Sequence, residues 1–599
     1  MATGIKRVYS DFAGVDFRND PSLVGINRSP DALNVWKNYE TEGGCIETRP
    51  GFSLIATIGT NILGMYILNN TTAIIHSHNK LYKWSNFPEA PTEQTLTTLY
   101  TGMSETQKSV FNKFKDKLYI NDGTNYLYYD GTVCQAVTNI AYVPTTSIGR
   151  APSGGGEMLE DVNVLQPKRK NSFLADGTST EYYLDATNID SVDKVYVNDV
   201  EVTNYTVSTT LGKVTFTTAP STPAISGQDN VLIEFSKTVS GYANRIAKCT
   251  RAVIWDNRLF FTGNPDYPNA LFHSQLENPA YISDLKYYED GANDSYIKDI
   301  IVGADVLWVF KINDQNNNNV FYHVKDLNEE AGAVYPVKQG NVSTGCINRA
   351  TNYKDDVVYL SHNGLEGIRT TELDSRQIIA HRSSLVDSKL LSEPTYIDAE
   401  FCEYKGYLCI LCNNHVYLAD ARQKFAVLDS FEYEWYYWNI SNMSPRILKT
   451  YNDKLYIGGT DGKIYILNGT NDNNEKIDSY WTTMMDNFGY ENHMKTTSKR
   501  GGVVKVKTIQ NGKIKVARRT NKSMEWRDST EKNLQGFSFV DLDFGNFTFT
   551  TTAQSYLVFK IKEKKISEIA LKFYSDEKDK PFGVYSATIE AFIGSYLKK

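Results

Sequence analysis

The chain has 599 residues, which at about 100–200 residues per domain predicts three to five compact units. Its 63 Lys and Arg against 70 Asp and Glu give a net charge of −7, which excludes a protein drawn to nucleic acid by its overall charge. With 41% hydrophobic residues, 40 Tyr and 27 Phe, the composition excludes global disorder and favours β-structure.

The first residues, MATGIKRVYSDFAG, lack the apolar stretch of a secretory signal, so we expect synthesis in the cytosol. No run of about 18 apolar residues occurs, so no membrane span is expected. The seven cysteines are scattered and odd in number, which favours reduced, buried thiols over a disulfide framework.

Residues 61–149 and 241–478 repeat a pattern of turn, alternating strand and turn. One aliphatic residue marks each repeat: Leu81, Leu118, Leu259, Leu307, Val358, Leu408 and Leu455. The gaps between successive markers are 37, 141, 48, 51, 50 and 47 residues, and all but one are close to the roughly 40–50 residues of a propeller blade. We therefore predict an all-β chain with a β-propeller of six or seven blades, and residues 1–60 docking on it or completing it.

The long gap between markers predicts an insertion. Residues 150–240 open with the glycine-rich run Ser153–Glu157 and continue as strongly alternating segments, with Asn198-Asp199 as a hairpin turn. We predict a small β-domain inserted between two blades.

Residues 479–599 form a basic module, with 21 basic and 13 acidic residues against 42 and 57 in the rest of the chain. Alternation over Val503–Arg519 and the Asn511-Gly512 pair predict a hairpin within a C-terminal β-sandwich. Its lysines alternate with Val and Ile and are predicted to line one sheet face. A solvated face is the first interpretation and docking to an acidic neighbour the second; DNA contact is third, because nucleic-acid sites usually interleave stacking aromatics or base-reading groups. The candidate assembly contacts are Lys505, Lys507, Lys513, Lys515, Arg518 and Arg519.

The motifs of catalysis and of metal binding are incomplete. Cys409 and Cys412 form a CxxC pair without a second ligand pair, and the amide-rich loops Asn313–Asn319 and Asn471–Glu475 lack the pattern of a calcium loop and are interpreted as solvated. The Asp-Gly turns lack the rest of a sialidase Asp-box, and the glycine-rich run lacks the Lys-Ser/Thr of a phosphate loop. We assign no catalytic, cofactor-binding or metal residue, and expect no enzyme activity and no cofactor.

Three segments carry a family resemblance. Asp11–Phe52 resembles the opening of propeller-bearing tail-hub or nozzle proteins of bacteriophages, the group that includes the packaged-DNA stabilisation proteins of short-tailed phages. Asp256–Ile282 resembles a blade of that family, and Trp481–Thr496 resembles the entry to its C-terminal sandwich. The residues that match are Gly14, Arg28–Ala32, Asn34, Gly43-Gly44, Arg49–Phe52, Arg258, Gly263, Asn264, Pro268 and Ser274. The inserted domain has no counterpart.

The resemblance implies a structural virion protein located in the tail and assembled in the host cytoplasm. It implies a ring of copies, expected to be six, below the portal and adaptor, which extends the DNA-ejection conduit and helps to retain the packaged genome. DNA would pass through without sequence-specific binding, because an acidic wall does not hold the phosphate backbone. The alternative is a glycan-binding, or with less support glycan-cleaving, propeller at the tail tip that recognises the host. A WD40-type scaffold is disfavoured because the one Trp-Asp pair, Trp255-Asp256, does not recur.

Overall fold

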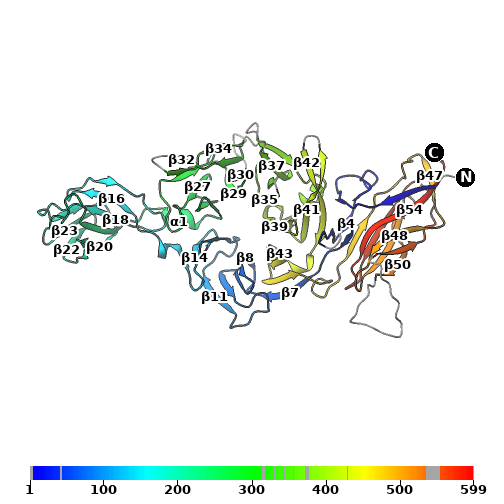
Figure 1. Ribbon diagram of the computed structural model, residues 1–599, viewed down its shortest axis with the longest axis horizontal. Coiled ribbons are helices and arrows are strands. Elements are labelled where there is room, and N and C mark those ends of the chain that lie inside the picture. The colour runs from blue at the N-terminus through cyan, green and yellow to red at the C-terminus, as the bar shows by residue number, and fades with distance from the viewer. Residues whose placement is uncertain are drawn as a thin grey trace. The chain divides into compact units, whose positions relative to one another are not determined.

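The structure is a computed structural model that describes residues 4–40, 44–312, 318–328, 332–340, 344–354, 356–370, 377–427, 430–534 and 554–597. The chain divides into two compact units: unit 1 comprises residues 1–77, 83–96 and 351–599, and unit 2 comprises residues 78–82 and 97–350. Figure 1 labels the strands and colours them by residue number. The predicted all-β class is confirmed, since the longest helix among the described residues is α1 (Tyr242–Ala247).

Seven four-stranded antiparallel sheets form the propeller within the described residues, at the upper end of the predicted range. Three of them lie in unit 2: β12 (Val110–Phe114), β13 (Lys117–Asn121), β14 (Tyr126–Tyr129) and β15 (Cys134–Ala136); β25 (Arg251–Trp255), β26 (Arg258–Thr262), β27 (Ala270–His273) and β28 (Tyr287–Glu289); β29 (Ile297–Gly303), β30 (Val306–Lys311), β31 (Val320–His323) and β34 (Val337–Gln339). Three lie in unit 1: β35 (Ala350–Tyr353), β36 (Asp356–Ser361), β37 (Gly364–Thr370) and β38 (Gln377–His381); β39 (Glu400–Tyr404), β40 (Tyr407–Cys412), β41 (His415–Val427) and β42 (Ser430–Asn439); β43 (Pro445–Tyr451), β44 (Lys454–Gly459), β45 (Lys463–Leu467) and β7 (Phe52–Thr57). The remaining sheet contains β8 (Ile62–Asn69), β9 (Thr72–Ser77), β10 (Lys80–Trp84) and β11 (Leu96–Thr101).

The sheet of β43, β44, β45 and β7 combines strands from the two ends of the repeat. Strand β7, which precedes all other propeller strands in the chain, pairs antiparallel with β45, with Phe52 opposite Leu467 and Ala56 opposite Ile464. In Figure 1 the blue β7 lies beside the yellow strands of this sheet. The start and the end of the repeat are thus held by main-chain hydrogen bonds in one sheet.

The seven marker residues are all buried, with at most 2% of their surface exposed. Six of them lie on the second strand of their sheets, whereas Leu81 lies on the third strand, β10. An inner strand packs on both faces, so its apolar run is the part of each repeat that the sequence pattern detects best.

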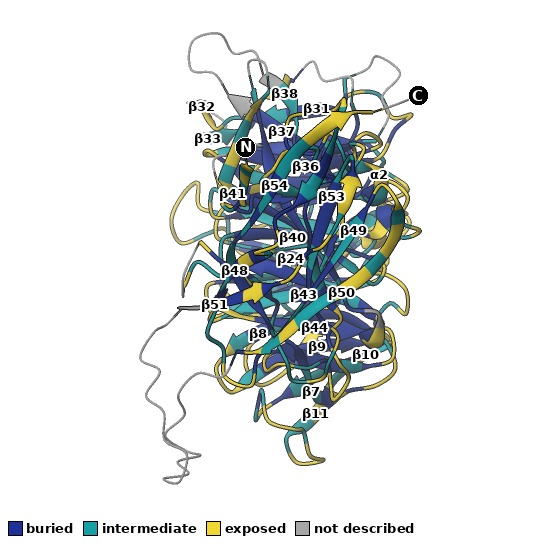
Figure 2. Cartoon of the chain, turned by 90° about the vertical axis from the view of Figure 1, so that its right-hand side faces the viewer, coloured by how far each residue is buried: buried dark blue, intermediate teal, exposed yellow. Residues whose placement is uncertain are grey.

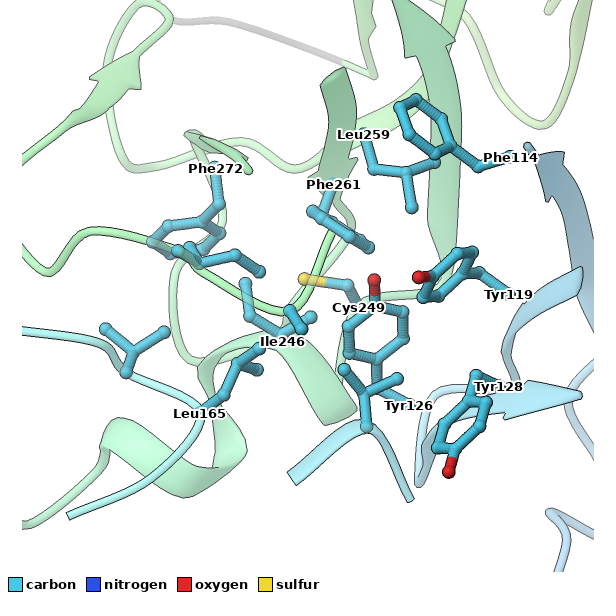
Figure 3. Packing of buried hydrophobic residues seen from close by; sticks show 14 of the residues in the cluster. Phe114, Tyr119, Tyr126, Tyr128, Leu165, Ile246, Cys249, Leu259, Phe261 and Phe272 are labelled. Carbon is cyan, nitrogen blue, oxygen red and sulfur yellow. The ribbon is translucent and has the colours of Figure 1, made fainter. Parts of the chain in front are cut away.

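A separate core supports the sheets of unit 2 around Cys249. Its thiol lies among Ile246, Phe261 and Tyr126 (Figure 3), and the cluster joins the β12–β15 and β25–β28 sheets to α1.

The insertion has a core of its own, which includes Phe173, Tyr182, Val214 and Ile233. Its two sheets run in the orders β17-β16-β18-β24-β20-β21 and β19-β23-β22. The strands are β16 (Thr145–Arg150), β17 (Glu157–Met158), β18 (Lys168–Phe173), β19 (Glu181–Tyr183), β20 (Ser191–Val197), β21 (Val200–Glu201), β22 (Tyr205–Ser208), β23 (Lys213–Phe216) and β24 (Val231–Ser236). The predicted Asn198-Asp199 turn is confirmed, because Val197 pairs with Val200 and both turn residues have positive φ.

Two sheets form the C-terminal sandwich, and both include strands from the N-terminal segment, residues 4–51. The first sandwich sheet contains β1 (Gly4–Tyr9), β5 (Val35–Lys37), β6 (Ile46–Thr48), β47 (His493–Thr497), β48 (Gly502–Lys507), β51 (Gln554–Phe559), β52 (Lys564–Ile566) and β54 (Gly583–Tyr596). The second sandwich sheet contains β4 (Ala32–Leu33), β46 (Ser479–Thr482), β49 (Lys513–Thr520), β50 (Ser523–Asn533) and β53 (Ile569–Ser575). Residues 479–599 therefore do not build the sandwich alone.

The predicted hairpin at Asn511-Gly512 is wrong. A tight turn does form there, with Asn511 at φ 57° and the Gly512 amide donating to the Ile509 carbonyl. However, β48 pairs with β51 and β54, whereas β49 pairs with β50 and β53, so the turn crosses from one sheet to the other. Packing between the two sheets outweighed the local turn signal.

Candidate functional site

The six basic candidates do not share one face, because they lie on different sandwich sheets. Lys505 and Lys507 belong to β48, and the other four belong to β49. Most of them have acidic partners within the chain: Lys507 with Glu47, Lys513 with Glu531 and Glu577, Lys515 with Asp576 and Glu577, and Arg518 with Glu563. The guanidinium of Arg519 lies 4.7 Å from the ring centroid of Trp526, and burial lowers its pKa. The half-buried β49 lysines Lys513 and Lys515 therefore lie on a face where they are paired with carboxylates.

The polar centre of unit 1 is instead the buried guanidinium of Arg49, in the N-terminal segment. It donates to both carboxylate oxygens of Asp472, at 2.9 and 2.6 Å, and to the side-chain oxygen of Asn34 at 2.9 Å. The carbonyl oxygens of Pro50 and Asn439 accept its remaining bonds. This network holds the entry to β7 against the loop that follows β45, so it closes the same end of the sheet that β7 completes.

Asp472 corrects the interpretation of the Asn471–Glu475 loop as a solvated loop. Its carboxylate is buried and also accepts a hydrogen bond from the Phe52 amide. Neighbouring Gly51 must remain glycine, because a Cβ there would lie 1.8 Å from the Asn471 carbonyl oxygen. The loop is thus part of a packed junction.

A second ion pair fastens the N-terminal segment to β42. Arg28 donates to both carboxylate oxygens of Glu434, and its guanidinium stacks 4.3 Å from the ring centroid of Phe425. Burial raises the pKa of Glu434, against the lowering effect of Arg28. Beside this pair Gly14 packs on Trp435, whose carbonyl oxygen would lie 2.5 Å from a Cβ at that position.

The same segment is fastened to the sandwich. Arg7 donates to both carboxylate oxygens of Asp486, and the Tyr9 hydroxyl donates to the same carboxylate at 2.9 Å. Burial raises the pKa of Tyr9 well above its ordinary value. The Asn34 amide donates to the Asp478 carbonyl from a residue with φ 55°. The N-terminal segment therefore joins the sandwich to the propeller sheets of unit 1 through buried polar side chains.

An open cavity of about 370 Å³ lies at this junction. Its walls come from the N-terminal segment, the loop after β45, the end of β48 with the turn that follows it, and the loop before β54. They include Glu47, Thr470, Lys507, Ile509 and Pro581. The Lys507 ammonium donates to the Glu47 carboxylate at 2.5 Å on the wall, so this charge pair is already balanced.

The matched blade segment is also structural. Arg258 donates to the Tyr335 hydroxyl and to the Ser274 carbonyl. The Ser274 hydroxyl accepts from the Leu259 amide, and the Asn264 amide donates to the Asn244 and Arg245 carbonyls. These side chains tie the strands of the blade to one another, to α1 and to the segment before β34.

Two histidines, His323 and His381, are paired with acids, whereas the buried His273 contacts the Ser274 carbonyl oxygen. The His323 ring is fully buried and bonds to Asp290 at 3.1 Å, which raises its pKa although burial alone would lower it. His381 is less buried and contacts Asp387 at 2.6 Å and Glu366 at 3.4 Å. Burial lowers the pKa of His381, but these bonds outweigh it and raise the value to about 10. The His323 pair is fully enclosed, whereas the His381 side chain is 30% exposed.

The thiols are reduced and shielded. None of the seven cysteines forms a disulfide, and burial raises the pKa of Cys402 to about 11 and that of Cys134 to about 12. No group of His, Cys, Asp and Glu within the described ranges has the arrangement to hold a metal ion. No described helix is long and apolar enough to cross a membrane.

Sequence reasoning missed the acidic partners Asp472, Glu434 and Asp486. Each of them lies more than 400 residues from its arginine, so no spacing in the sequence joins the two.

No protein-family model and no curated protein matches the chain. Among solved structures it is similar to BamB of Moraxella catarrhalis, with 8% identity over 73% of this chain and 90% of that one and a TM-score of 0.29. An exo-β-1,3-galactanase of Phanerochaete chrysosporium is 8% identical over 57% and 95%, with a TM-score of 0.21. PorZ of the type IX secretion system of Porphyromonas gingivalis is 10% identical over 89% and 86%, with a TM-score of 0.19. At these scores the likenesses assign no function, and the description of the chain as a β-propeller with an inserted β-domain and a C-terminal sandwich follows from its sheet topology.

Proposed function

We propose that the chain is a structural protein of a bacteriophage tail, of the hub or nozzle type. Copies assemble as a ring, expected to be a hexamer, below the portal and adaptor. The ring extends the conduit for DNA ejection and helps to retain the packaged genome.

The supporting observation is that the residues of the N-terminal segment that carry the family resemblance have structural roles. Gly14, Arg28, Asn34, Arg49 and Gly51 all lie where the N-terminal segment is packed between the sandwich and the propeller sheets of unit 1. Their side chains, or the absence of one, serve packing and buried hydrogen bonds. The resemblance thus rests on residues that hold domains together, which is what a wall around mutually repelling DNA phosphates requires.

The charge distribution gives secondary support. Residues 1–478 carry 42 basic and 57 acidic residues, so this body repels a phosphate backbone more than it holds it. A conduit lined in this way lets DNA slide, whereas a basic lining would bind it in a salt-dependent manner.

Mass photometry of the purified full chain tests the proposal, alone and mixed with a portal–adaptor complex purified from a short-tailed phage. The expected result is a species near six times the 67.7 kDa protomer, either alone or only with the complex. The portal–adaptor complex measured alone and an unrelated ring of similar mass are the controls. A monomer that ignores the complex contradicts the proposal, and saturable binding on a glycan array would then favour the host-recognition alternative.

A further inference from the structure

The outer face of the first sandwich sheet carries an exposed apolar row. Val8, Thr588, Val503 and Val558 are register neighbours across four adjacent strands, β1, β54, β48 and β51. The three valines are 44%, 37% and 61% exposed, and Tyr556, two residues from Val558, is 62% exposed. In a sandwich with solvent on both outer faces, such positions are normally polar. Lys505 lies beside Tyr556 in the register. Together with the three valines these two residues form the apolar row.

The second sandwich sheet shows what a solvated face looks like in the same module. Its outward lysines Lys513 and Lys515 have carboxylate partners, and its edge strand β50 carries five charged residues among eleven. Charged edges prevent unwanted strand pairing. By contrast, β51 has the sequence QSYLVF without a charge, and among the described strands it pairs only with β48. Figure 2 looks onto these strands, with exposed positions in yellow.

We infer that the apolar row docks onto the acidic body of a second copy of this chain. The inference deepens the proposed function, on which it rests, by naming the surface through which copies meet. A contact between two different surfaces repeats head to tail, and such contacts generate rings when the rotation closes.

The distribution of charge along the chain indicates that a second copy of this chain covers the apolar row. Lys505 lies within the row, and no carboxylate in the described part of the chain is paired with it, whereas Lys507, Lys513, Lys515 and Arg518 all have partners. The sandwich region 479–599 has an excess of eight basic residues, and residues 1–478 have an excess of 15 acidic ones. The sandwich of one copy and residues 1–478 of the next are therefore complementary in charge. The valines of the row add apolar surface whose removal from water favours association.

The test compares a double aspartate variant in the apolar row with a single aspartate variant elsewhere on the sandwich. Mass photometry over a concentration series measures how far each variant assembles. Val503→Asp with Val558→Asp places charges inside the apolar row, and the expected result is a loss of about 100-fold or more in association. Met524→Asp is the matched control, because Met524 is 62% exposed on β50 of the same sandwich. It should assemble as the unchanged chain does. Equal thermal unfolding midpoints of the variants separate lost docking from lost folding.

Lys505→Glu provides an independent reading that leaves the valines intact. It should weaken association and reverse its dependence on ionic strength, because the charge opposite the acidic body changes sign.

The outcomes separate the two proposals. Assembly of the Val503→Asp, Val558→Asp variant at the concentrations of the unchanged chain overturns the inference and leaves the tail function standing. Assembly through the row into species that are not rings of about six copies, without any binding to the portal–adaptor complex, supports the inference and contradicts the tail function. An unchanged chain that stays monomeric throughout contradicts both.

Discussion

The N-terminal junction and the outer face of the second sandwich sheet both pair basic with acidic side chains, but in different surroundings. The side chains of Arg49 and Asp472 are 0% and 6% exposed, whereas those of Lys515 and Asp576 are 21% and 44% exposed. A buried charge that loses its partner retains its full desolvation cost, while an exposed one is resolvated by water. The comparison shows that ion pairs of the same chemistry hold buried segments together in one region and keep a sheet face hydrated in the other.

The largest expected effect on stability follows from breaking the buried Arg49–Asp472 pair. Arg49→Met removes five donated hydrogen bonds and leaves Asp472 buried without its cation, so we expect the free energy of unfolding of unit 1 to fall by about 3–5 kcal/mol. Urea denaturation followed by tryptophan fluorescence measures it. Unchanged stability would mean that water reaches Asp472 and that the junction is not closed.

The half-buried pair should show an intermediate loss. Arg28→Leu keeps the contact with Phe425 but removes the cation from Glu434, whose pKa is already raised by burial. We expect a loss of about 2 kcal/mol that becomes smaller in acid, because Glu434 then protonates and its buried charge disappears. Denaturation near pH 5 and near pH 8 checks the direction, and an equal loss at both would contradict it.

His381 gives a pH-dependent version of the comparison. Its folded pKa is about 10, above the roughly 6.5 of an unfolded histidine, so the charged ring stabilises the fold fully below about pH 6.5. This contribution declines as the pH rises and is lost as it passes through about 10. His381→Gln should therefore cost most stability near pH 6 and little near pH 10. A constant difference between the two proteins across this range would show that the contacts with Asp387 and Glu366 carry no charge dependence.

The smallest effect is expected on the solvated face. Lys515→Ala removes two exposed ion pairs and should change the free energy of unfolding by no more than about 1 kcal/mol. The same denaturation assay measures it, in low and in high salt. A loss as large as that of Arg49→Met would abolish the distinction between the two regions.

The propeller was predictable because its signal is local and repeated. Each repeat places an apolar inner strand next to a tight turn, and the markers from Leu81 to Leu455 recorded that strand seven times. The Asn198-Asp199 hairpin was predictable for the same reason, since its two strands pair directly across the turn. The Asn511-Gly512 turn has an equally clear local signal, yet its strands join different sheets, because the buried faces of β48 and β49 find better partners elsewhere.

By itself the sequence determined the all-β class, the blade spacing, the place of the insertion and the alternation of the basic strands, all of which follow from side-chain periodicity within a few residues. Only the tertiary structure decided that β7 completes the last sheet, that Arg49 meets Asp472 and that one sandwich face is ion-paired while the other is apolar. These features depend on groups hundreds of residues apart, and what selects them is the cost of burying a charge or an apolar surface without a partner, which no local pattern records.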